Sequence, residues 1–455
     1  MIAPDPARHL TPMCREPHAR VTGSLTAVTS VDDMLAFIDA SPSPYHAVEE
    51  AARRLADAGF QAVEPDGEWS GGPGRHMVQR GGALVAWEVP EGASPHQRFR
   101  IVGAHTDSPN LRVKPQPDTG AAGWQQLAVE VYGGALWNSW LDRDLGLSGR
   151  AAVRTDRGVE QRLLRIDEPL LRIPQLAIHL DRGVSEGLKL DPQRHLTPVW
   201  GVGPVHPGGF REVLEDHLGV ASSAILGWDV MLHDVNPGTR LGTDGELVSV
   251  ARIDNLLSCW AATEAIGSAA QTDAAPDPHR PVGVICLYDH EEVGSTSATG
   301  ADGALLGHVL ERSVLARGGT RDDHLRAMAG SVCASADGAH ATHPNYAERH
   351  EPGHQVAIDG GPVIKVNANQ RYATDAGTAA VMVDACERAG VPHQWFVSRN
   401  DMPCGSTIGP VTAARLGIPT VDVGVAQLSM HSARELCGAE DPVRLTHALR
   451  AFLAG

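Results

Sequence analysis

The chain has 455 residues, 42% hydrophobic and 20% charged, a composition ordinary for a globular protein of two or three domains or one large α/β unit with an insertion. Its formal net charge of −17 repels nucleic-acid phosphates and anionic membranes, so neither is expected as a partner. The seven cysteines form no Cys-x-x-Cys pair, which argues against a disulfide framework and a thiolate zinc site and favours a cytoplasmic location.

The N-terminal 1–28 segment carries several prolines and charges but no apolar core of signal-peptide length, so we expect a disordered tail. Residues 29–112 then predict the first part of an α/β domain. Its expected elements are a helix that begins at Val31 behind the capping residue Ser30, a helix from Tyr45 to the residue before Gly59, and strands over 83–89 and 99–104.

The character of the sequence changes over residues 113–243. Alternating runs such as 127–132 and 176–180 are interspersed with proline and glycine, and long helical periodicity is scarce. We therefore expect a β-rich insertion between two parts of the α/β domain.

Residues 244–455 return to an alternation of strands and helices, which predicts an α/β fold with a mostly parallel sheet flanked by helices. The expected strands cover 282–288, 331–336, 363–366, 393–397 and 420–425. The expected helices cover 255–270, a segment that Thr374 caps and that ends at Gly390, and 441–453.

Acidic and imidazole side chains follow several of these predicted strands or begin a helix. Because the carboxyl ends of strands in an open parallel sheet meet in one crevice, we expect these side chains to lie together. They are His105, Asp254, Glu291, Glu292, Asp337 and His431.

Two histidines and several carboxylates without a thiolate suit zinc or another divalent cation. One aspartate can bridge two metal ions held about 4 Å apart. We expect His105, Asp254 and Asp337 to bind metal A. We expect Asp254, Glu292 and His431 to bind metal B.

The adjacent residues Glu291 and Glu292 cannot both face one metal from a regular strand, because successive side chains point to opposite faces. In a turn they can divide the work, so that Glu292 binds metal and Glu291 takes the proton of the attacking water. Asp107, two residues after His105, is expected to hydrogen-bond the far imidazole nitrogen and fix the tautomer.

These residues fall within segments that resemble those of the aspartyl aminopeptidases, a cytosolic group of metallo-aminopeptidases. The resemblance extends from about residue 30 to the C-terminus. The segments are Ala-Ser-Pro-Ser-Pro-Tyr-His (40–46), Gly-Ala-His-Thr-Asp-Ser-Pro (103–109), Ile-Pro-Gln-Leu-Ala-Ile-His-Leu (173–180), Asp-His-Glu-Glu-Val-Gly-Ser (289–295), His-Ala-Thr-His-Pro-Asn-Tyr (340–346), Gly-Pro-Val-Ile-Lys-Val-Asn-Ala-Asn-Gln-Arg-Tyr (361–372), Asp-Met-Pro-Cys-Gly-Ser-Thr-Ile-Gly-Pro (401–410) and Met-His-Ser-Ala-Arg-Glu (430–435).

The resemblance implies two zinc ions, which manganese or cobalt could replace, with Asp254 bridging and Glu291 as the base. It implies removal of an N-terminal Asp or Glu from peptides, and a homo-oligomer, a dodecamer built from dimers. The catalytic α/β domain (29–112 and 244–455) would be interrupted by a dimerisation domain (113–243). The implied substrate contacts are His179, His340, Lys365 and Tyr372.

The sequence departs from the family pattern at two positions. His290 stands where the family usually has Asn, and Gly338 follows Asp337 where Met is common. Neither is an expected ligand, so these departures concern only the fine positioning of the site.

Other interpretations remain open at this point. Lys365 could be an edge-strand solubility residue, and His179 a hydrogen-bonded core histidine, while His340 and Tyr372 could support the site without touching substrate. The enzyme could be a related two-metal peptidase or deacylase that prefers neutral residues, or the chain could be a metal-binding assembly protein without activity. The segment 183–187 matches a serine-hydrolase elbow, which needs a strand leading straight in and a helix leading out, but Asp181 and Arg182 intervene before it and Asp191-Pro192 blocks a long helix after it.

Overall fold

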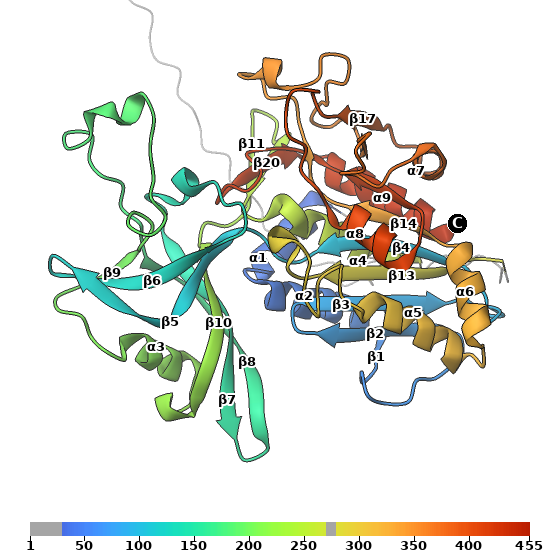
Figure 1. Cartoon of the computed structure of the whole chain (residues 1–455), viewed down its shortest axis with the longest axis horizontal. Helices are drawn as coiled ribbons and strands as arrows, with labels where there is room; N and C mark the ends of the chain where they lie inside the picture. Colours follow the sequence, from blue (N-terminus) through green and yellow to red (C-terminus); the bar gives the residue numbers. More distant parts are fainter. Residues whose placement is uncertain (1–29, 270–278) are drawn as a thin grey trace, which may run out of the picture.

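A computed structural model describes residues 30–269 and 279–455, so the tail expected at 1–28 lies outside the described residues. Figure 1 shows an α/β body at the right and a second body at the left, which is built mainly of long strands. The chain passes from the first body into the second between β4 (Phe99–His105) and β5 (Asn110–Ala121). The fold class expected from the sequence is confirmed.

The α/β body is built on a sheet of nine strands within the described residues. Three of its central strands, β13, β4 and β14, run parallel to one another, and three of the eight pairings are antiparallel, so the sheet is mixed but mostly parallel. In spatial order the strands are β1 (Gln61–Ala62), β2 (Gly74–Arg80), β3 (Ala83–Val89), β13 (Val282–Tyr288), β4 (Phe99–His105), β14 (Val332–Ala336), β18 (Thr420–Gly424), β16 (Val363–Val366) and β17 (Gln394–Val397).

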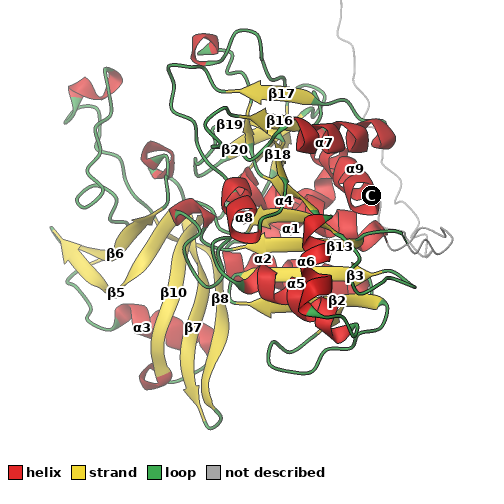
Figure 2. Cartoon of the chain, turned by 45° about the vertical axis from the view of Figure 1, so that its right-hand side comes forward, coloured by secondary structure: helices red, strands yellow, loops and turns green. Residues whose placement is uncertain are grey.

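Helices cover both faces of this sheet, as Figure 2 shows. Every residue of β13 is buried, because Ile285 and Leu287 pack on one face while Val284 and Cys286 pack on the other. This two-sided burial explains the unbroken apolar run that predicted the strand. The first face carries α1 (Val31–Ala40), α2 (Pro44–Asp57), α4 (Ile253–Ala269), α7 (Ala376–Ala389) and α9 (Asp441–Ala454), and the second carries α5 (Leu305–Ala316), α6 (Arg321–Ala329) and α8 (Ile408–Leu416).

The second body is a six-stranded sheet that closes its own apolar core against α3 (Gly209–Leu218). Its strands lie between residues 110 and 234, which is the region expected to be a β-rich insertion. The sheet begins three residues before the predicted boundary at 113 and ends nine residues before the predicted boundary at 243. The strands in spatial order are β8 (Gly158–Leu171), β7 (Leu145–Thr155), β10 (Ile225–Asp234), β5 (Asn110–Ala121), β6 (Trp124–Tyr132) and β9 (Val199–Val202).

A small five-stranded sheet lies beside the α/β body. Its strands precede or follow three of the predicted site residues, which are Asp254, Asp337 and His431. It contains β11 (Thr239–Leu241), β12 (Leu247–Val250), β20 (Glu435–Gly438), β19 (Ala426–Leu428) and β15 (Ala339–His340).

The sequence prediction of a cap at Thr374 was wrong by one residue. Asp375 caps α7, because its carboxylate accepts a hydrogen bond from the Thr378 amide at 2.8 Å and the Thr378 hydroxyl accepts one from the Asp375 amide at 3.0 Å. The Thr374 hydroxyl instead accepts a hydrogen bond from the amide of Asp422 at 2.8 Å, so it joins the loop to β18.

Candidate metal centre

The central parallel strands end at the same edge of the sheet and bring their following residues together. His105 is the last residue of β4, Asp337 directly follows β14, and the short helix η4 (Glu291–Val293) comes three residues after β13. Convergence at the carboxyl ends is a property of parallel strands. The structure therefore places the predicted side chains from three strands in one region.

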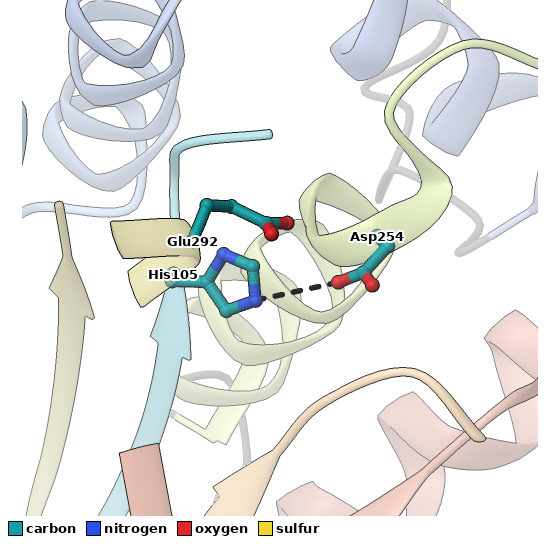
Figure 3. A group of neighbouring side chains, drawn as sticks. All are labelled: His105, Asp254 and Glu292. Atoms are coloured by element: carbon teal, nitrogen blue, oxygen red, sulfur yellow. Dashed lines mark ion pairs between the residues drawn. The ribbon is translucent and has the colours of Figure 1, made fainter. Parts of the chain in front are cut away.

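Asp254 lies between the two imidazoles, at the start of α4. Its Oδ1 is 3.3 Å from Nε2 of His105, and its Oδ2 is 3.4 Å from Nε2 of His431. The Ser108 hydroxyl donates to the Asp254 carbonyl at 2.7 Å and holds this turn. Figure 3 shows His105, Asp254 and Glu292 pointing toward one another from a strand end, a helix start and the η4 turn.

The remaining two carboxylates complete the cluster on opposite sides of Asp254. Oδ1 of Asp337 lies 3.6 Å from Nε2 of His105, and Oε2 of Glu292 lies 3.4 Å from Nε2 of His431. The His105 side chain is 1% exposed and that of His431 is 32% exposed, so solvent reaches the centre from the His431 side.

The donor set fits a divalent cation. Oε1 of Glu292 and Oδ1 of Asp254 are buried and accept no hydrogen bond from the described residues. Burial, followed by the neighbouring charge of Asp254, raises the pKa of Glu292 well above its usual range. Buried carboxylates that lie this close to one another need a neighbouring positive charge to balance their negative charges. Imidazole nitrogens and carboxylate oxygens are ligands that zinc accepts, even without a thiolate.

The imidazoles respond to the same negative charge. Burial lowers the pKa of His431, but the hydrogen bond to Asp254 and the charge of Glu292 outweigh it and raise the pKa to about 10.

The carboxyl group of Glu291 also has a shifted pKa. Burial raises this pKa to about 7, the negative charges of Asp337 and Asp254 add to the shift, and the charge of His105 opposes it.

Asp107 holds the site together differently from the prediction. Nδ1 of His105 donates to the main-chain carbonyl of Asp107 at 3.0 Å, whereas the Asp107 carboxylate lies 3.5 Å away. That carboxylate accepts the amides of Glu291 at 3.0 Å and Glu292 at 3.1 Å, and the hydroxyl of Tyr132 at 2.7 Å. The expected residue therefore fixes His105 through its backbone, while its side chain fixes the Glu291–Glu292 turn.

Glu435, at the start of β20, was not singled out from the sequence. Its buried carboxylate accepts the amide of Asp254 at 2.8 Å and the amide of His431 at 2.6 Å. It thus fixes the backbones of two cluster residues that are far apart in the chain. The only sequence signal was an acid inside the segment 430–435, directly before an apolar strand.

Three of the four predicted substrate contacts come together beside the cluster. The rings of His340 and Tyr372 lie 6.1 Å and 6.2 Å from the Phe396 ring. The Lys365 ammonium is 5.1 Å from the Tyr372 ring and donates to the carbonyls of Asp337 at 3.3 Å and Gly338 at 3.0 Å. Lys365 is 1% exposed, so it is not a solubility residue of an edge strand.

The fourth, His179, lies elsewhere. It is exposed in a turn of the second body and is flanked by exposed Leu176, Ile178 and Leu180. It is therefore not a core histidine. Ser185, in the segment that matched a serine-hydrolase elbow, is exposed in a single 3-10 turn that no strand leads into directly.

The two departures from the family pattern have local explanations. His290 has a φ of +66°, a left-handed conformation that Asn and His adopt more readily than most residues. A side chain at Gly338 would bring its Cβ within 2.9 Å of Cε of Met430, which occupies that space.

A mostly parallel sheet, with two imidazoles and three carboxylates gathered beside its strand ends, defines a candidate metal-dependent enzyme. The sequence model of the aminopeptidase I zinc metalloprotease (M18) family matches residues 37–453, so the chain belongs to this family and is a zinc metallo-aminopeptidase. This confirms the resemblance to metallo-aminopeptidases. Among the described residues, no helix has the length and apolar character needed to cross a membrane.

Similar proteins cover nearly the whole chain. A "Probable M18 family aminopeptidase 2" of Streptomyces coelicolor is 61% identical over 424 residues, which are 93% of this chain and 97% of that protein. One of Mycobacterium leprae is 53% identical over 428 residues, covering 93% and 98%.

Among solved structures, a chain in the cryo-electron microscopy structure of the Ape4 and Nbr1 complex is similar, with 36% identity and a TM-score of 0.90. That match covers 93% of this chain and 85% of the other. The structure of the S. cerevisiae mApe1 dodecamer matches with 28% identity and a TM-score of 0.81, covering 93% and 95%.

Proposed function

We propose that this metallo-aminopeptidase removes N-terminal Asp or Glu from peptides with a dinuclear zinc centre and a glutamate base. The observation that carries the dinuclear proposal is the position of Asp254. Its two carboxylate oxygens face two different imidazoles at 3.3 Å and 3.4 Å, as a bridging carboxylate does.

The cluster divides naturally around Asp254. His105 and Asp337 would hold metal A with it, and Glu292 and His431 would hold metal B. Zinc ions bound there would supply Lewis acidity toward the peptide carbonyl and would acidify a bound water. Manganese or cobalt could occupy the same N and O donors.

Glu291 would move the proton. Among the described residues, its side chain takes part in none of the ion pairs of the cluster, while its amide donates to Asp107 at 3.0 Å. A carboxylate that is free of metal and held beside the ligand Glu292 can take a proton from the attacking water and return it to the leaving amine.

Lys365 would give the preference for acidic residues. Its ammonium has three donors and uses two of them on the carbonyls of Asp337 and Gly338, at the edge of the cluster. A buried positive charge beside His340 and Tyr372 favours a carboxylate of the substrate over an aliphatic side chain.

The assembly would be a dodecamer built from dimers, with the six-stranded body as the dimerisation domain. This extends to the present chain what the mApe1 dodecamer shows for that protein. Exposed apolar side chains on this body, including Leu176, Ile178 and Leu180, suit burial against another copy. His179 lies among them, so it would reach substrate only from a neighbouring chain. A cytoplasmic location remains an expectation from the cysteine pattern.

Glu291→Gln tests the function. Because glutamine cannot accept the proton, we expect zinc binding to be retained and turnover to fall by about 10²-fold or more. The measurement is release of aspartate, glutamate and leucine from matched peptides by the metal-stripped protein, before and after zinc, manganese or cobalt is restored.

Equal turnover by Glu291→Gln and the wild type would contradict the base assignment. A restored wild-type protein that released leucine faster than aspartate would favour the neutral-residue alternative. No release of any residue after metal is restored would favour the metal-binding assembly protein without activity.

A further inference from the structure

Residues 132–136 lead from the end of β6 to the short helix η1 (Trp137–Trp140), which precedes β7 of the same six-stranded body, and they contact one side of the candidate centre. The first contact is made by Tyr132, whose buried hydroxyl donates to Oδ2 of Asp107 at 2.7 Å. The Arg112 guanidinium lies over the Tyr132 ring, 3.7 Å from the ring centroid. The hydroxyl is therefore held on the carboxylate that fixes the Glu291–Glu292 turn.

Gly133 follows at a close approach to Glu292. It has a φ of +70°, and a Cβ added there would lie 3.0 Å from Cβ of Glu292. A side chain at this position would therefore be strained and would press on the carboxylate-bearing residue. The absence of a side chain lets the connecting segment run against Glu292.

Gly134 and Leu136 hold His431. Nδ1 of His431 donates to the Gly134 carbonyl at 3.2 Å, and the Leu136 amide donates to the His431 carbonyl at 2.9 Å. With Nδ1 engaged in this way, Nε2 faces Asp254 and Glu292 at 3.4 Å each. A hydrogen bond from the distal ring nitrogen to a carbonyl fixes both the tautomer and the orientation of a metal-binding histidine.

We propose that residues 132–136 are a positioning element for metal B, which rests on the proposed dinuclear function. The segment touches Glu292 and His431, the two residues that belong to metal B alone. None of its described hydrogen bonds goes to His105 or Asp337, which would complete metal A. The six-stranded body is thereby part of the active centre within its own chain, in addition to its proposed role in assembly.

Gly134→Ala tests this element, because its Cβ would lie 3.2 Å from Nδ1 of His431 and would force the ring to move. We expect the affinity for one of the two zinc ions to fall by about 10-fold or more, with the other unchanged, when the metal-stripped full-length protein is titrated with zinc. The matched control is Gly227→Ala, where an added Cβ meets nothing within 4 Å.

Gly133→Ala provides a second variant with its own control. Gly123, at the other end of β6, also has a positive φ, but an added Cβ there meets nothing within 4 Å. Gly123→Ala therefore carries the backbone strain without the contact to Glu292. We expect the selective loss of zinc affinity in Gly133→Ala only.

Tyr132→Phe removes only the hydroxyl. We expect kcat and the affinity for one of the two zinc ions each to fall by about 10-fold, with KM unchanged, because the Asp107 contact to the Glu291–Glu292 turn is weakened. Tyr45 also lies buried under an arginine, with Arg150 at 4.1 Å from its ring, so Tyr45→Phe is the matched control.

Wild-type affinities for both zinc ions in Gly134→Ala and Gly133→Ala would overturn the proposal, as would an equal loss of both affinities in a variant. These outcomes are distinct from failure of the proposed function. A wild-type protein that binds only one zinc ion would overturn the dinuclear centre. A wild-type protein that does not prefer N-terminal Asp or Glu would overturn the proposed substrate specificity. In either case, the zinc affinity of each glycine variant relative to its control still decides whether residues 132–136 position a metal ligand.

Discussion

Lys365 shows how burial changes the meaning of a single residue. In the sequence it follows two apolar residues and could be a solubility lysine, but the structure buries it with its ammonium on the carbonyls of Asp337 and Gly338. It pairs across the strands with buried Asp422. Burial raises the pKa of Asp422, and the Lys365 charge opposes that shift. The positive charge of Lys365 therefore lies inside the molecule, beside the candidate metal centre.

Lys365→Met keeps the length of the side chain and removes its charge. We expect the ratio of kcat/KM for N-terminal Asp over Leu to fall at least about tenfold, because a hydrogen bond to a charged group contributes about 1.5–3 kcal/mol. The exposed Lys189 of the six-stranded body supplies the control Lys189→Met. An unchanged ratio, even with lower turnover, would refute the role of Lys365 in acidic preference.

At the scale of elements, two buried carboxylates join segments that the chain keeps far apart. Asp107 accepts the amides of the η4 turn, and Glu435 accepts those of Asp254 and His431. Each therefore fixes a pair of backbone positions from which cluster side chains extend. Because the amides of Asp254 and His431 share the Glu435 carboxylate, displacement of one of these two segments affects the other.

Glu435→Gln tests this link between α4 and the loop before β20. A glutamine side chain has one acceptor oxygen, so one of the two backbone amides loses its partner inside the protein. We expect zinc affinity to fall by about 10-fold to 100-fold, measured by zinc titration of the metal-stripped protein. Glu440→Gln, at an exposed position five residues away, is expected to bind zinc as the wild type does.

Most elements of the α/β body could be predicted from the sequence. Strands buried on both faces appear as unbroken apolar runs, and those over 83–89, 282–288 and 363–366 are confirmed to the residue. The strand β2 and the helices α5, α6 and α8 were not predicted. In β2 only three of seven residues are buried, so its apolar pattern is short.

At the scale of the whole molecule, His46 of α2 lies at the junction of the two bodies. Burial, followed by the positive charges of Arg165 and His233, lowers its pKa from 6.5 to about 4, while Asp167 opposes the shift and Arg252 adds to it. The folded state thus binds this proton less readily than the unfolded state. The resulting stability is present above about pH 6.5 and is lost as the pH falls toward 4.

His46→Gln should reduce this loss. The shift corresponds to at most about 3 kcal/mol, so the acid destabilisation between pH 6.5 and 4 should be smaller in the variant than in the wild type. Urea unfolding at several pH values measures it, and the exposed His308 supplies the control His308→Gln. Parallel pH profiles for His46→Gln and the wild type would contradict the prediction.

The sequence alone determined the residue types of the site and the sheet edge at which they would meet. It could do so because strand ends of a parallel sheet share an edge, which places His105, Asp337 and the Glu291–Glu292 pair near one another before any distance is known. The α/β class and the β-rich character of the middle region followed from local apolar patterns.

Only the tertiary structure decided which atoms face one another. It placed the two oxygens of Asp254 on different imidazoles, gave Glu435 its two amides, and brought residues 132–136 onto Glu292 and His431. These contacts join residues up to about 300 positions apart, as with Gly134 and His431. A local pattern carries no signal for them, because the contacts depend on how separate elements pack.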